Sequence, residues 1–529
     1  MSALLLGIDL GTTTAKSVIY DAEGNLIASS TVEYPIYYPQ PGWAEQNAEE
    51  WWDAVVKTIR DVIKKVNPTD ISGICVSGQR EGVAPLTKDG EVLDRVIIWM
   101  DRRSVPEAEM LKKQFSESEI FKITGLRIDS TFTATKLLWL KKHKPKIYER
   151  TYCFLQPKDF IVYKLTGEFV TDYSIASRTL LFDVVNRSWS EKLFEMFNLD
   201  IEKFPKAIPA HKIAGEIPSE VARTTGLKKG TPVLAGGGDR PIESLGAGVI
   251  LSKMMSESTG TGLSATVPLE EPFFDKNMNF IVGVHVIPNM WALETGIGVI
   301  GAILRWYRDN FGLCEKRLGE FMNIRGYELL DLAADLVPPG SNKLFVVPMF
   351  MGARVPRWNP YVRGVIFGLT LAHNRIHIAR AIMEGAAYEF RYCFETLERT
   401  GIKIEEIRSI GGGGKTPLWA QIKADILNRP VVLPKERDAG PLGDAILAGF
   451  GVGVFSNLKN AVDTMVKVEK IIHPNKENVQ IYEKYYRVYL KLVDALTNVY
   501  NELASLPEAK PKEVRWTKDK LIHLLYLLE

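Results

Sequence analysis

The sequence predicts an α/β protein built from two large domains. The chain has 529 residues, which is too many for one ordinary domain. Near the N-terminus, short apolar runs alternate with an amphipathic helical pattern, which is typical of a mixed sheet covered by helices. Two glycine-containing turns of similar type lie roughly half a chain apart, at residues 9–16 and 258–262. We therefore expect two related halves with a boundary near residue 250.

The N-terminal segment is expected to form a three-stranded meander, a helix and a buried strand. Apolar runs at 4–10, 16–20 and 26–36 flank the polar turn 21–25 and predict the meander. Asn47 precedes apolar residues at helical spacing and predicts a helix over 48–66. Residues 71–76 have the pattern of a buried strand. Further glycine-rich strand ends are expected at 233–239 and 409–414, the second followed by a helix over 418–427.

These patterns suggest three parts, which are an N-terminal domain (1–249), a C-terminal domain (250–474) and a helical extension (475–529). In the extension, apolar residues at helical spacing run from Ile481 to Val499. A linker rich in Pro, Lys and Glu and a last apolar segment at 521–528 follow. We expect a docked pair of C-terminal helices and not a membrane anchor.

Composition narrows the class of protein. The 66 Lys and Arg residues nearly balance the 64 Asp and Glu residues, which argues against a nucleic-acid binder. The four cysteines form no CxxC pair, so we expect buried thiols in a reducing cytosol. The N-terminus lacks a signal-peptide pattern and no apolar stretch is long enough to cross a membrane. We therefore expect a cytoplasmic protein with neither a membrane nor a nucleic-acid partner.

Residues 9–16, with the sequence DLGTTTAK, carry the first candidate phosphate site. Gly11 permits a tight turn and close approach of the backbone. Backbone N–H groups and threonine hydroxyls could hold phosphate oxygens, Lys16 could meet phosphate charge, and Asp9 could hold Mg²⁺ directly or through water. The spacing is not that of a P-loop. The alternative is a plain hairpin with polar turn residues.

Two further turns fit the same site. Residues 258–262 (STGTG) could form a second clamp on the phosphates, and the four glycines at 411–414 could leave room for adenine and ribose. Taken alone, residues 258–262 are better explained as an ordinary turn between strands, and the alternative for 411–414 is a simple strand-to-helix turn. The three together favour a nucleotide site for Mg-ATP.

A longer sequence match relates these motifs to a known protein family. Residues 364–369 (GVIFGL) followed by 377–384 (HIARAIME) resemble the C-terminal signature of the FGGY carbohydrate kinases, in the actin and hexokinase ATPase superfamily. Residues 133–140 (TATKLLWL) resemble the other signature, with a departure at Thr131. The resemblance covers about residues 4–470. It implies two ribonuclease H-like (actin/hexokinase-type) domains flanking a central cleft, an ATP-dependent sugar kinase, and a homodimer as its plausible assembly.

The resemblance also assigns roles residue by residue. It makes Asp239 the catalytic base that takes the proton of the attacking hydroxyl, and we expect Asp9 and Asp239 at the metal. The positions implied to bind ATP are Thr12, Thr13, Thr14, Lys16, Thr261, Gly301, Arg305 and Gly413. The positions implied to face the sugar are Gln79, Arg80, Glu81, Trp99, Thr131, Asp239 and Arg240.

The acceptor remains open at this stage, because the substrate positions mix two patterns. Arg80-Glu81 resembles glycerol kinases, whereas Trp99-Met100-Asp101 is more similar to xylulokinases. Thr131 and Ser264 stand where glycerol kinases place aromatic residues, which favours a larger substrate such as a pentulose like xylulose. Arg240 could recognise a carboxylate and so permit a sugar acid.

Two alternatives to a pentulose kinase remain open. One is a glycerol kinase or another polyol or sugar-acid kinase of the same family. The other, from a different class, is a non-catalytic sugar or nucleotide sensor on the same fold. The presence of Asp9, Asp239 and both phosphate turns argues against the sensor.

Overall fold

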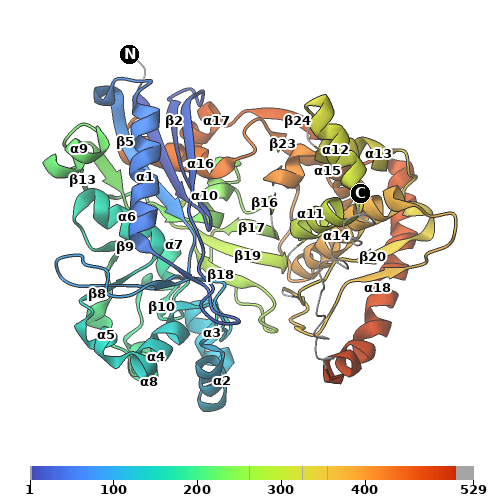
Figure 1. Ribbon diagram of the computed structural model, residues 1–529, viewed down its shortest axis with the longest axis horizontal. Coiled ribbons are helices and arrows are strands. Elements are labelled where there is room, and N and C mark those ends of the chain that lie inside the picture. The colour runs from blue at the N-terminus through green and yellow to red at the C-terminus, as the bar shows by residue number, and fades with distance from the viewer. Residues whose placement is uncertain (1–2, 261, 299, 325, 354, 508–529) are drawn as a thin grey trace, which may run out of the picture.

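The computed structural model describes residues 3–260, 262–298, 300–324, 326–353 and 355–507. Two α/β bodies lie side by side, each organised around a seven-stranded mixed sheet (Figure 1). The two-domain α/β architecture expected from the sequence is therefore confirmed.

The first sheet begins with the expected meander. Strands pair antiparallel along the path β1–β2–β3, and β5 and then β14 add parallel to β1. The strands, in sheet order, are β13 (Ile213–Glu216), β14 (Pro232–Leu234), β5 (Ile71–Gly78), β1 (Leu4–Leu10), β2 (Thr14–Asp21) and β3 (Leu26–Glu33), with β15 (Gly237–Gly238) paired to the end of β5.

The second sheet repeats this plan. Here β16, β17 and β19 form the antiparallel meander, β22 and β23 add parallel, and β24 closes the edge antiparallel, as β13 does in the first sheet. The strands, in sheet order, are β18 (Ile281–Val284), β19 (Trp291–Gly298), β17 (Leu263–Leu269), β16 (Met254–Thr259), β22 (Glu406–Ile410), β23 (Val431–Pro434) and β24 (Val468–Ile472). The shared topology supports two related halves.

Helices cover both sheets, and short two-stranded sheets occur in the segments that connect the main elements. The helices are α1 (Ala48–Ile63), α2 (Val105–Gln114), α3 (Glu117–Thr124), α4 (Thr133–His143), α5 (Pro145–Arg150), α6 (Pro157–Thr166), α7 (Tyr173–Ala176), α8 (Glu191–Phe197), α9 (Ser219–Thr225), α10 (Asp239–Gly246), α11 (Ile300–Phe311), α12 (Leu313–Met322), α13 (Gly326–Asp335), α14 (Arg375–Glu398), α15 (Pro417–Leu427), α16 (Ala439–Gly451), α17 (Leu458–Met465) and α18 (Lys476–Ser505). The pairs are β4 (Glu45–Gln46) with β7 (Val96–Ile97), β6 (Ala84–Leu86) with β8 (Cys153–Leu155), β9 (Val170–Asp172) with β12 (Lys206–Ile208), β10 (Phe182–Asp183) with β11 (Ser188–Trp189), and β20 (Phe345–Val347) with β21 (Val365–Phe367).

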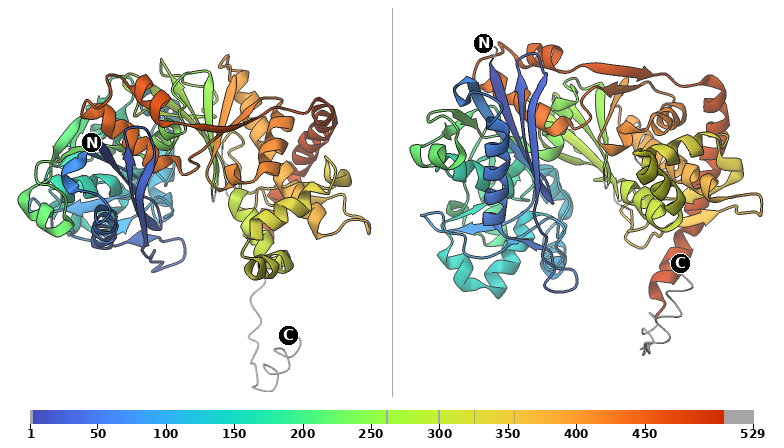
Figure 2. Two further views of the ribbon diagram at one scale, coloured as in Figure 1. Left: turned by 90° about the horizontal axis from the view of Figure 1, so that it is seen from above. Right: turned by 45° about the horizontal axis from the view of Figure 1, so that its top comes forward.

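Strand β1 is buried on both faces because a different helix covers each one. Leu6 and Ile8 pack in one core with Trp51 of α1, whereas Leu5 packs in another with Leu442 of α16. The alternation follows from the two-residue period of a strand. Helices α16 and α17 thus lie against the N-terminal sheet although they come late in the sequence (Figure 2).

Helices α10 and α16 cross at backbone contact. A Cβ atom added at Gly246 of α10 would lie 1.8 Å from the carbonyl oxygen of Ala439, and one at Gly443 of α16 would lie 2.2 Å from that of Ile242. Only glycine permits such an approach. The crossing fixes the N-terminal ends of both helices near the end of β1. Asp239 is the first residue of α10, and Asp438 directly precedes α16.

A buried carboxyl reinforces the same interface. Asp444 of α16 accepts hydrogen bonds from Ser77 Oγ at 2.7 Å and Cys75 Sγ at 3.3 Å, both on β5. Burial, together with the nearby charge of Asp9, raises the pKa of Asp444 well above its ordinary value. A protonated Asp444 therefore fits the core between α16 and β5 without an unpaired charge.

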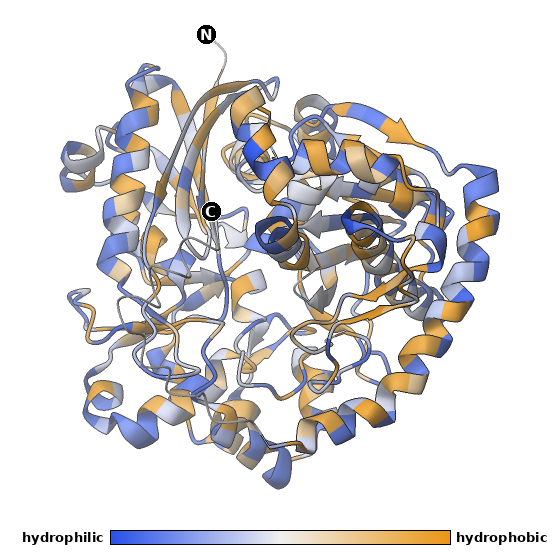
Figure 3. Cartoon of the chain, turned by 45° about the vertical axis from the view of Figure 1, so that its right-hand side comes forward, coloured by the Kyte–Doolittle hydropathy of each residue, from blue (hydrophilic) through white to orange (hydrophobic). Residues whose placement is uncertain are grey.

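The C-terminal extension docks on the second body. Tyr482, Tyr486, Tyr489, Val493 and Tyr500 are buried on one face of α18, while Ile481, Val488 and Val499 are exposed. Hydrophilic and hydrophobic residues follow one another along this helix (Figure 3). One helix of the expected docked pair is therefore present. The apolar segment 521–528 lies outside the described residues, and no helix within the described part of the chain is long and apolar enough to span a membrane.

A few sequence expectations need correction. The first helix ends at Ile63 and not at 66, because Lys65 and Val66 close the last turn with hydrogen bonds to residues three positions back. The third strand ends at Glu33 and not at 36. Cys75, Cys153 and Cys393 are buried as expected, but Cys314 is exposed.

The helix crossing generates a stability prediction. Gly246→Ala should lower the free energy of unfolding by about 1–3 kcal/mol because the new methyl overpacks the α10–α16 contact, despite the better helix propensity of alanine. Urea unfolding measures this change. Gly296→Ala is the matched control, since no atom lies within 4 Å of a Cβ built there. Equal stability of the two variants would contradict the close crossing.

Candidate active site

Asp239 lies at the point where three elements of the first body meet. Strand β15 pairs with the end of β5, with Gly237 opposite Ser77 and Gly238 opposite Gly78. Asp239 then begins α10, directly beside the loop that follows β5. A Cβ at Gly238 would lie 2.5 Å from Cδ of Arg80. Glycine at this position therefore lets the Arg80 side chain run across the strand end toward Asp239.

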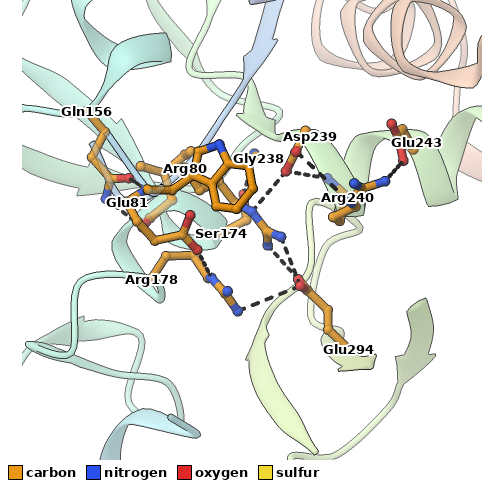
Figure 4. Close-up of polar contacts among 12 residues, drawn as sticks. Arg80, Glu81, Gln156, Ser174, Arg178, Gly238, Asp239, Arg240, Glu243 and Glu294 are labelled. Carbon is orange, nitrogen blue, oxygen red and sulfur yellow. Dashed lines mark hydrogen bonds and ion pairs between the residues drawn. The ribbon is translucent and has the colours of Figure 1, made fainter. Parts of the chain in front are cut away.

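Arg80 connects the expected base to a second carboxylate. Its Nε lies 2.9 Å from Oδ1 of Asp239, and its Nη1 and Nη2 donate to the two carboxylate oxygens of Glu294 at 2.6 and 2.9 Å (Figure 4). The Arg80 side chain is 8% exposed. Because a planar guanidinium holds bidentate partners in a fixed geometry, Arg80 orients both carboxylates.

Glu294 and Arg178 belong to this group, although the sequence did not single them out. Arg178 Nε donates to Glu81 Oε1 at 2.6 Å, and Arg178 Nη1 lies 3.6 Å from Glu294 (Figure 4). Burial favours the neutral form of Glu294, but Arg80 and Arg178 outweigh it and hold the pKa of Glu294 at about 2. Glu294 is the only charged residue in the strand β19, and that isolated charge was a signal available in the sequence.

The other expected sugar-facing residues surround this group. The backbone N–H of Glu81 donates to Gln156 Oε1 at 2.6 Å, and Glu81 has φ 66°, an uncommon conformation for a side-chain-bearing residue that is often found at functional sites. Thr131 is buried and accepts from Arg102 Nη1 at 3.1 Å. Arg240 is bound to Glu243 at 2.8 Å (Figure 4).

Two glutamines and a tryptophan join the sugar loop to the first phosphate turn. Gln79 Nε2 donates to Gln46 Oε1 at 2.8 Å, and Gln46 Nε2 donates to the carbonyl of Thr12 at 2.6 Å. Trp99 Nε1 donates to Thr12 Oγ1 at 3.1 Å. The structure therefore brings Gln79, Trp99 and Thr12 together, and Trp99 reaches the phosphate turn as well as the sugar side.

The first phosphate turn carries concentrated negative charge. Burial and the nearby carboxylates of Asp438, Glu243 and Asp239 raise the pKa of Asp9 to about 7, with Lys16 opposing. Lys16 forms an ion pair with Asp438, the residue before α16. Asp9 and Lys16 therefore lie in a group of four carboxylates, of which Asp239 and Glu243 also pair with Arg80 and Arg240.

These carboxylates fit Mg²⁺ bound together with a nucleotide. No group of three or more His, Cys, Asp or Glu residues positioned for a metal occurs among the described residues. Mg²⁺ commonly takes only one or two carboxylates, with phosphate oxygens and water completing its shell. Burial and the neighbouring carboxylates both raise the pKa of Asp9, and a bound cation would offset both effects.

A cavity of about 200 Å³ opens next to this turn. Its walls come from both bodies. The lining residues are Glu243, Ser258, Ile410, Gly411, Gly412, Arg437, Asp438 and Ala439. The turns expected at 258–262 and 411–414 therefore meet at one site. Gly413 packs against Thr259, where an added Cβ would lie 2.5 Å from Cβ of that residue.

A buried ion pair links the elements that carry these two turns. Lys423 Nζ of α15 lies 2.8 Å from Glu257 Oε2 of β16, and both side chains are almost wholly buried. Lys423 also donates to Thr259 Oγ1 at 3.1 Å, and Ser409 Oγ donates to Glu257 at 2.5 Å. One charged pair thus ties together β16, β22 and α15, from which the nucleotide turns emerge.

The other residues expected to bind ATP are brought together less closely. Thr13 is exposed and Thr14 half-buried at the start of β2. Gly301 is half-buried and Arg305 exposed on α11, and neither is among the described residues that line the cavity. Thr261 lies outside the described residues. Within the described chain, Asp9, Lys16 and the 411–414 turn are therefore linked to the cavity more directly than the two expected residues of α11 are.

Comparison with known protein families agrees with this geometry. The profile of the FGGY family of carbohydrate kinases matches residues 4–246 with its N-terminal domain and residues 255–452 with its C-terminal domain. The chain belongs to the FGGY family of carbohydrate kinases. As a member of this family it is a phosphotransferase that uses ATP to phosphorylate a carbohydrate.

Individual FGGY relatives carry several names. A xylulose kinase of Staphylococcus epidermidis is 32% identical over 490 residues, covering 92% of this chain and 95% of that protein. A glycerol kinase of Thermococcus gammatolerans is 33% identical, covering 90% and 94%. A gluconokinase of Bacillus subtilis is 28% identical, covering 95% and 98%. The ligand-bound xylulose kinase from Lactobacillus acidophilus superposes with a TM-score of 0.86 at 26% identity, covering 95% of this chain and 100% of that one.

The buried ion pair beneath the candidate nucleotide turns can be tested with a double-mutant cycle. Lys423→Met and Glu257→Gln should each lower the free energy of unfolding by about 3–5 kcal/mol, since each leaves a polar or charged partner buried without its counterpart. The double variant should lose much less than the sum. Urea unfolding of the four proteins tests this. Additive losses would show that Lys423 and Glu257 act independently.

The environment of Asp9 generates a pH prediction. Its pKa rises on folding from 3.8 to about 7, so the folded state retains a proton that the unfolded state releases. Stability should therefore fall as pH rises through this interval. In EDTA, the wild type should lose more stability between pH 5 and pH 8 than Asp9→Asn. Identical pH dependence of the two proteins in chemical unfolding would contradict the charge crowding at Asp9.

Proposed function

We propose that this kinase transfers the γ-phosphate of Mg-ATP to a hydroxyl of a neutral pentulose such as xylulose, with Asp239 as general base. The pairing of the arginines around Asp239 is the observation that carries the proposal. Each arginine of the candidate sugar site already has a carboxylate partner. The pairs are Arg80 with Asp239 and Glu294, Arg178 with Glu81, and Arg240 with Glu243.

A neutral sugar suits such a site better than a sugar acid. Hydroxyl groups both donate and accept, so they can bind to arginine N–H groups and to carboxylate oxygens at once. A substrate carboxylate would have to displace a buried glutamate from its arginine, at the cost of leaving that charge unpaired. Arg240, the residue expected to permit a sugar acid, is bound to Glu243 at 2.8 Å.

The names of the relatives point the same way without deciding the substrate. Xylulose kinases are among the most similar proteins, and glycerol and gluconate kinases also match. Thr131 is small and buried where glycerol kinases have an aromatic residue, so the pocket has room beyond a three-carbon polyol. Glycerol remains the second candidate because Arg80 and Glu81 match the glycerol kinase pattern.

The proposed chemistry assigns one task to each group. Asp239 accepts the proton of the attacking hydroxyl, and Arg80 holds that carboxylate in place. Lys16 leaves Asp438 to meet the phosphates, and the turns at 258–262 and 411–414 position them for in-line transfer. Mg²⁺, held near Asp9 with the nucleotide, would neutralise phosphate charge.

A cytoplasmic location and a homodimer complete the proposal. Exposed apolar side chains on the second body supply a surface for self-association, with Phe321 88%, Leu332 67% and Leu336 87% exposed. The near-neutral net charge of +2 offers no basis for nucleic-acid binding.

A substrate panel tests the proposal. The purified protein with Mg-ATP is offered xylulose, ribulose, glycerol and gluconate, and sugar-dependent ADP release is measured. We expect the highest kcat/KM with a pentulose. Asp239→Asn should lower kcat by about 100-fold or more, the scale of general base catalysis, while ADP binding is retained. Preferred turnover of glycerol or gluconate would refute the pentulose assignment, and near-normal turnover by Asp239→Asn would refute the base.

A further inference from the structure

Arg437 lines the nucleotide cavity and is not among the residues that the sequence assigned to ATP. It lies two residues before α16, and its side chain is 10% exposed. Nε donates to the carbonyl of Gly414 at 3.1 Å, and Nη2 donates to Glu469 at 2.8 Å. The third nitrogen, Nη1, is buried and has no hydrogen-bond partner among the described residues.

An unpaired guanidinium nitrogen at this depth requires an explanation. Arginine stays charged at all physiological pH values and carries only donors. Buried polar atoms in folded proteins nearly always find a partner, and an orphan among otherwise paired groups points to a missing ligand. The missing ligand must accept hydrogen bonds and tolerate a positive charge, which describes a phosphate oxygen.

We propose that Arg437 is a nucleotide-binding residue whose Nη1 donates to the phosphate closest to the nucleoside, the α-phosphate. This inference rests on the proposed nucleotide site. Arg437 contacts the glycine turn at two points, because its own carbonyl accepts from Gly411 N at 2.9 Å and its Nε binds Gly414. It therefore lies on the side of the cavity formed by the 411–414 turn. Lys16 and Asp9 lie with the first turn, where the transferred phosphate belongs.

The charges around the cavity support this division. Glu243 and Asp438 are the acidic residues that line it, and Asp438 is already bound to Lys16. A polyphosphate needs positive charge along its length, and Mg²⁺ near the carboxylates supplies it at one end only. Arg437 is the cationic side chain among the described lining residues. It therefore serves the nucleoside end of the chain of phosphates.

A ligand series locates the contact. Affinities of the full-length protein for adenosine, AMP and ADP are measured by calorimetry with and without Mg²⁺. In Arg437→Gln, binding of AMP and ADP should weaken by roughly 10- to 100-fold, the range of a charged hydrogen bond, while adenosine binding is unchanged. In kinetics, KM for ATP should rise while kcat at saturating ATP is retained.

Two control variants keep the test decisive. Glu469→Gln removes the outer partner of Arg437 but keeps the guanidinium, and its affinities should match those of the wild type. Arg437→Lys retains the charge and should recover part of the AMP affinity if Arg437→Gln folds poorly. Equal loss of adenosine and AMP binding, or unchanged AMP binding, would overturn the proposal. Failure of the proposed function itself would look different, because the wild type would then bind ADP but phosphorylate no sugar.

Discussion

The backbone contact between α10 and α16 is the constraint on which the site depends. Glycines at 246 and 443 let the helices touch, and this contact brings together two segments separated by some two hundred residues of sequence. Asp239 begins α10, and Asp438 and Arg437 directly precede α16. One helix crossing against β1 therefore positions the residues proposed to bind the sugar, the metal and the nucleotide.

Electrostatic pairing then divides the site into two regions of different character. Around Arg80 each arginine faces a carboxylate, with Arg80 paired to Asp239 and Glu294 and Arg178 paired to Glu81, and such a region suits an uncharged polyol. Asp9 lies near Asp438 and Lys16, and burial, together with the nearby carboxylates, raises the pKa of Asp9 to about 7. A metal ion bound with a polyphosphate would offset this effect without disturbing the region around Arg80. In the proposed site, the two substrates would therefore be separated by charge.

The sequence allowed the framework to be predicted better than the contacts. Strands β1 and β5, the Asn47 cap and the glycine turns were predictable because periodicity and turn chemistry are local. Arg178 was missed because its importance comes from long-range pairing with Glu81, which no local pattern encodes. Glu294 is marked locally only as a lone charge in a strand, and its pairing with Arg80 is likewise long-range. The Lys423–Glu257 pair was missed for the same reason. The placement of α16 on the first sheet also depends on tertiary packing, although its small residues are visible in the sequence.

We propose that sugar and nucleotide meet between Asp239 and the first phosphate turn. A crystal structure with Mg²⁺, a non-hydrolysable ATP analogue and a pentulose measures this directly. We expect one sugar hydroxyl within hydrogen-bond distance of Asp239 and roughly 3–3.5 Å from the γ-phosphorus, in line with the bond to be broken. The metal should lie near Asp9, between it and the phosphates. A sugar hydroxyl bound away from Asp239, or a γ-phosphate distant from Asp9 and Lys16, would contradict the account.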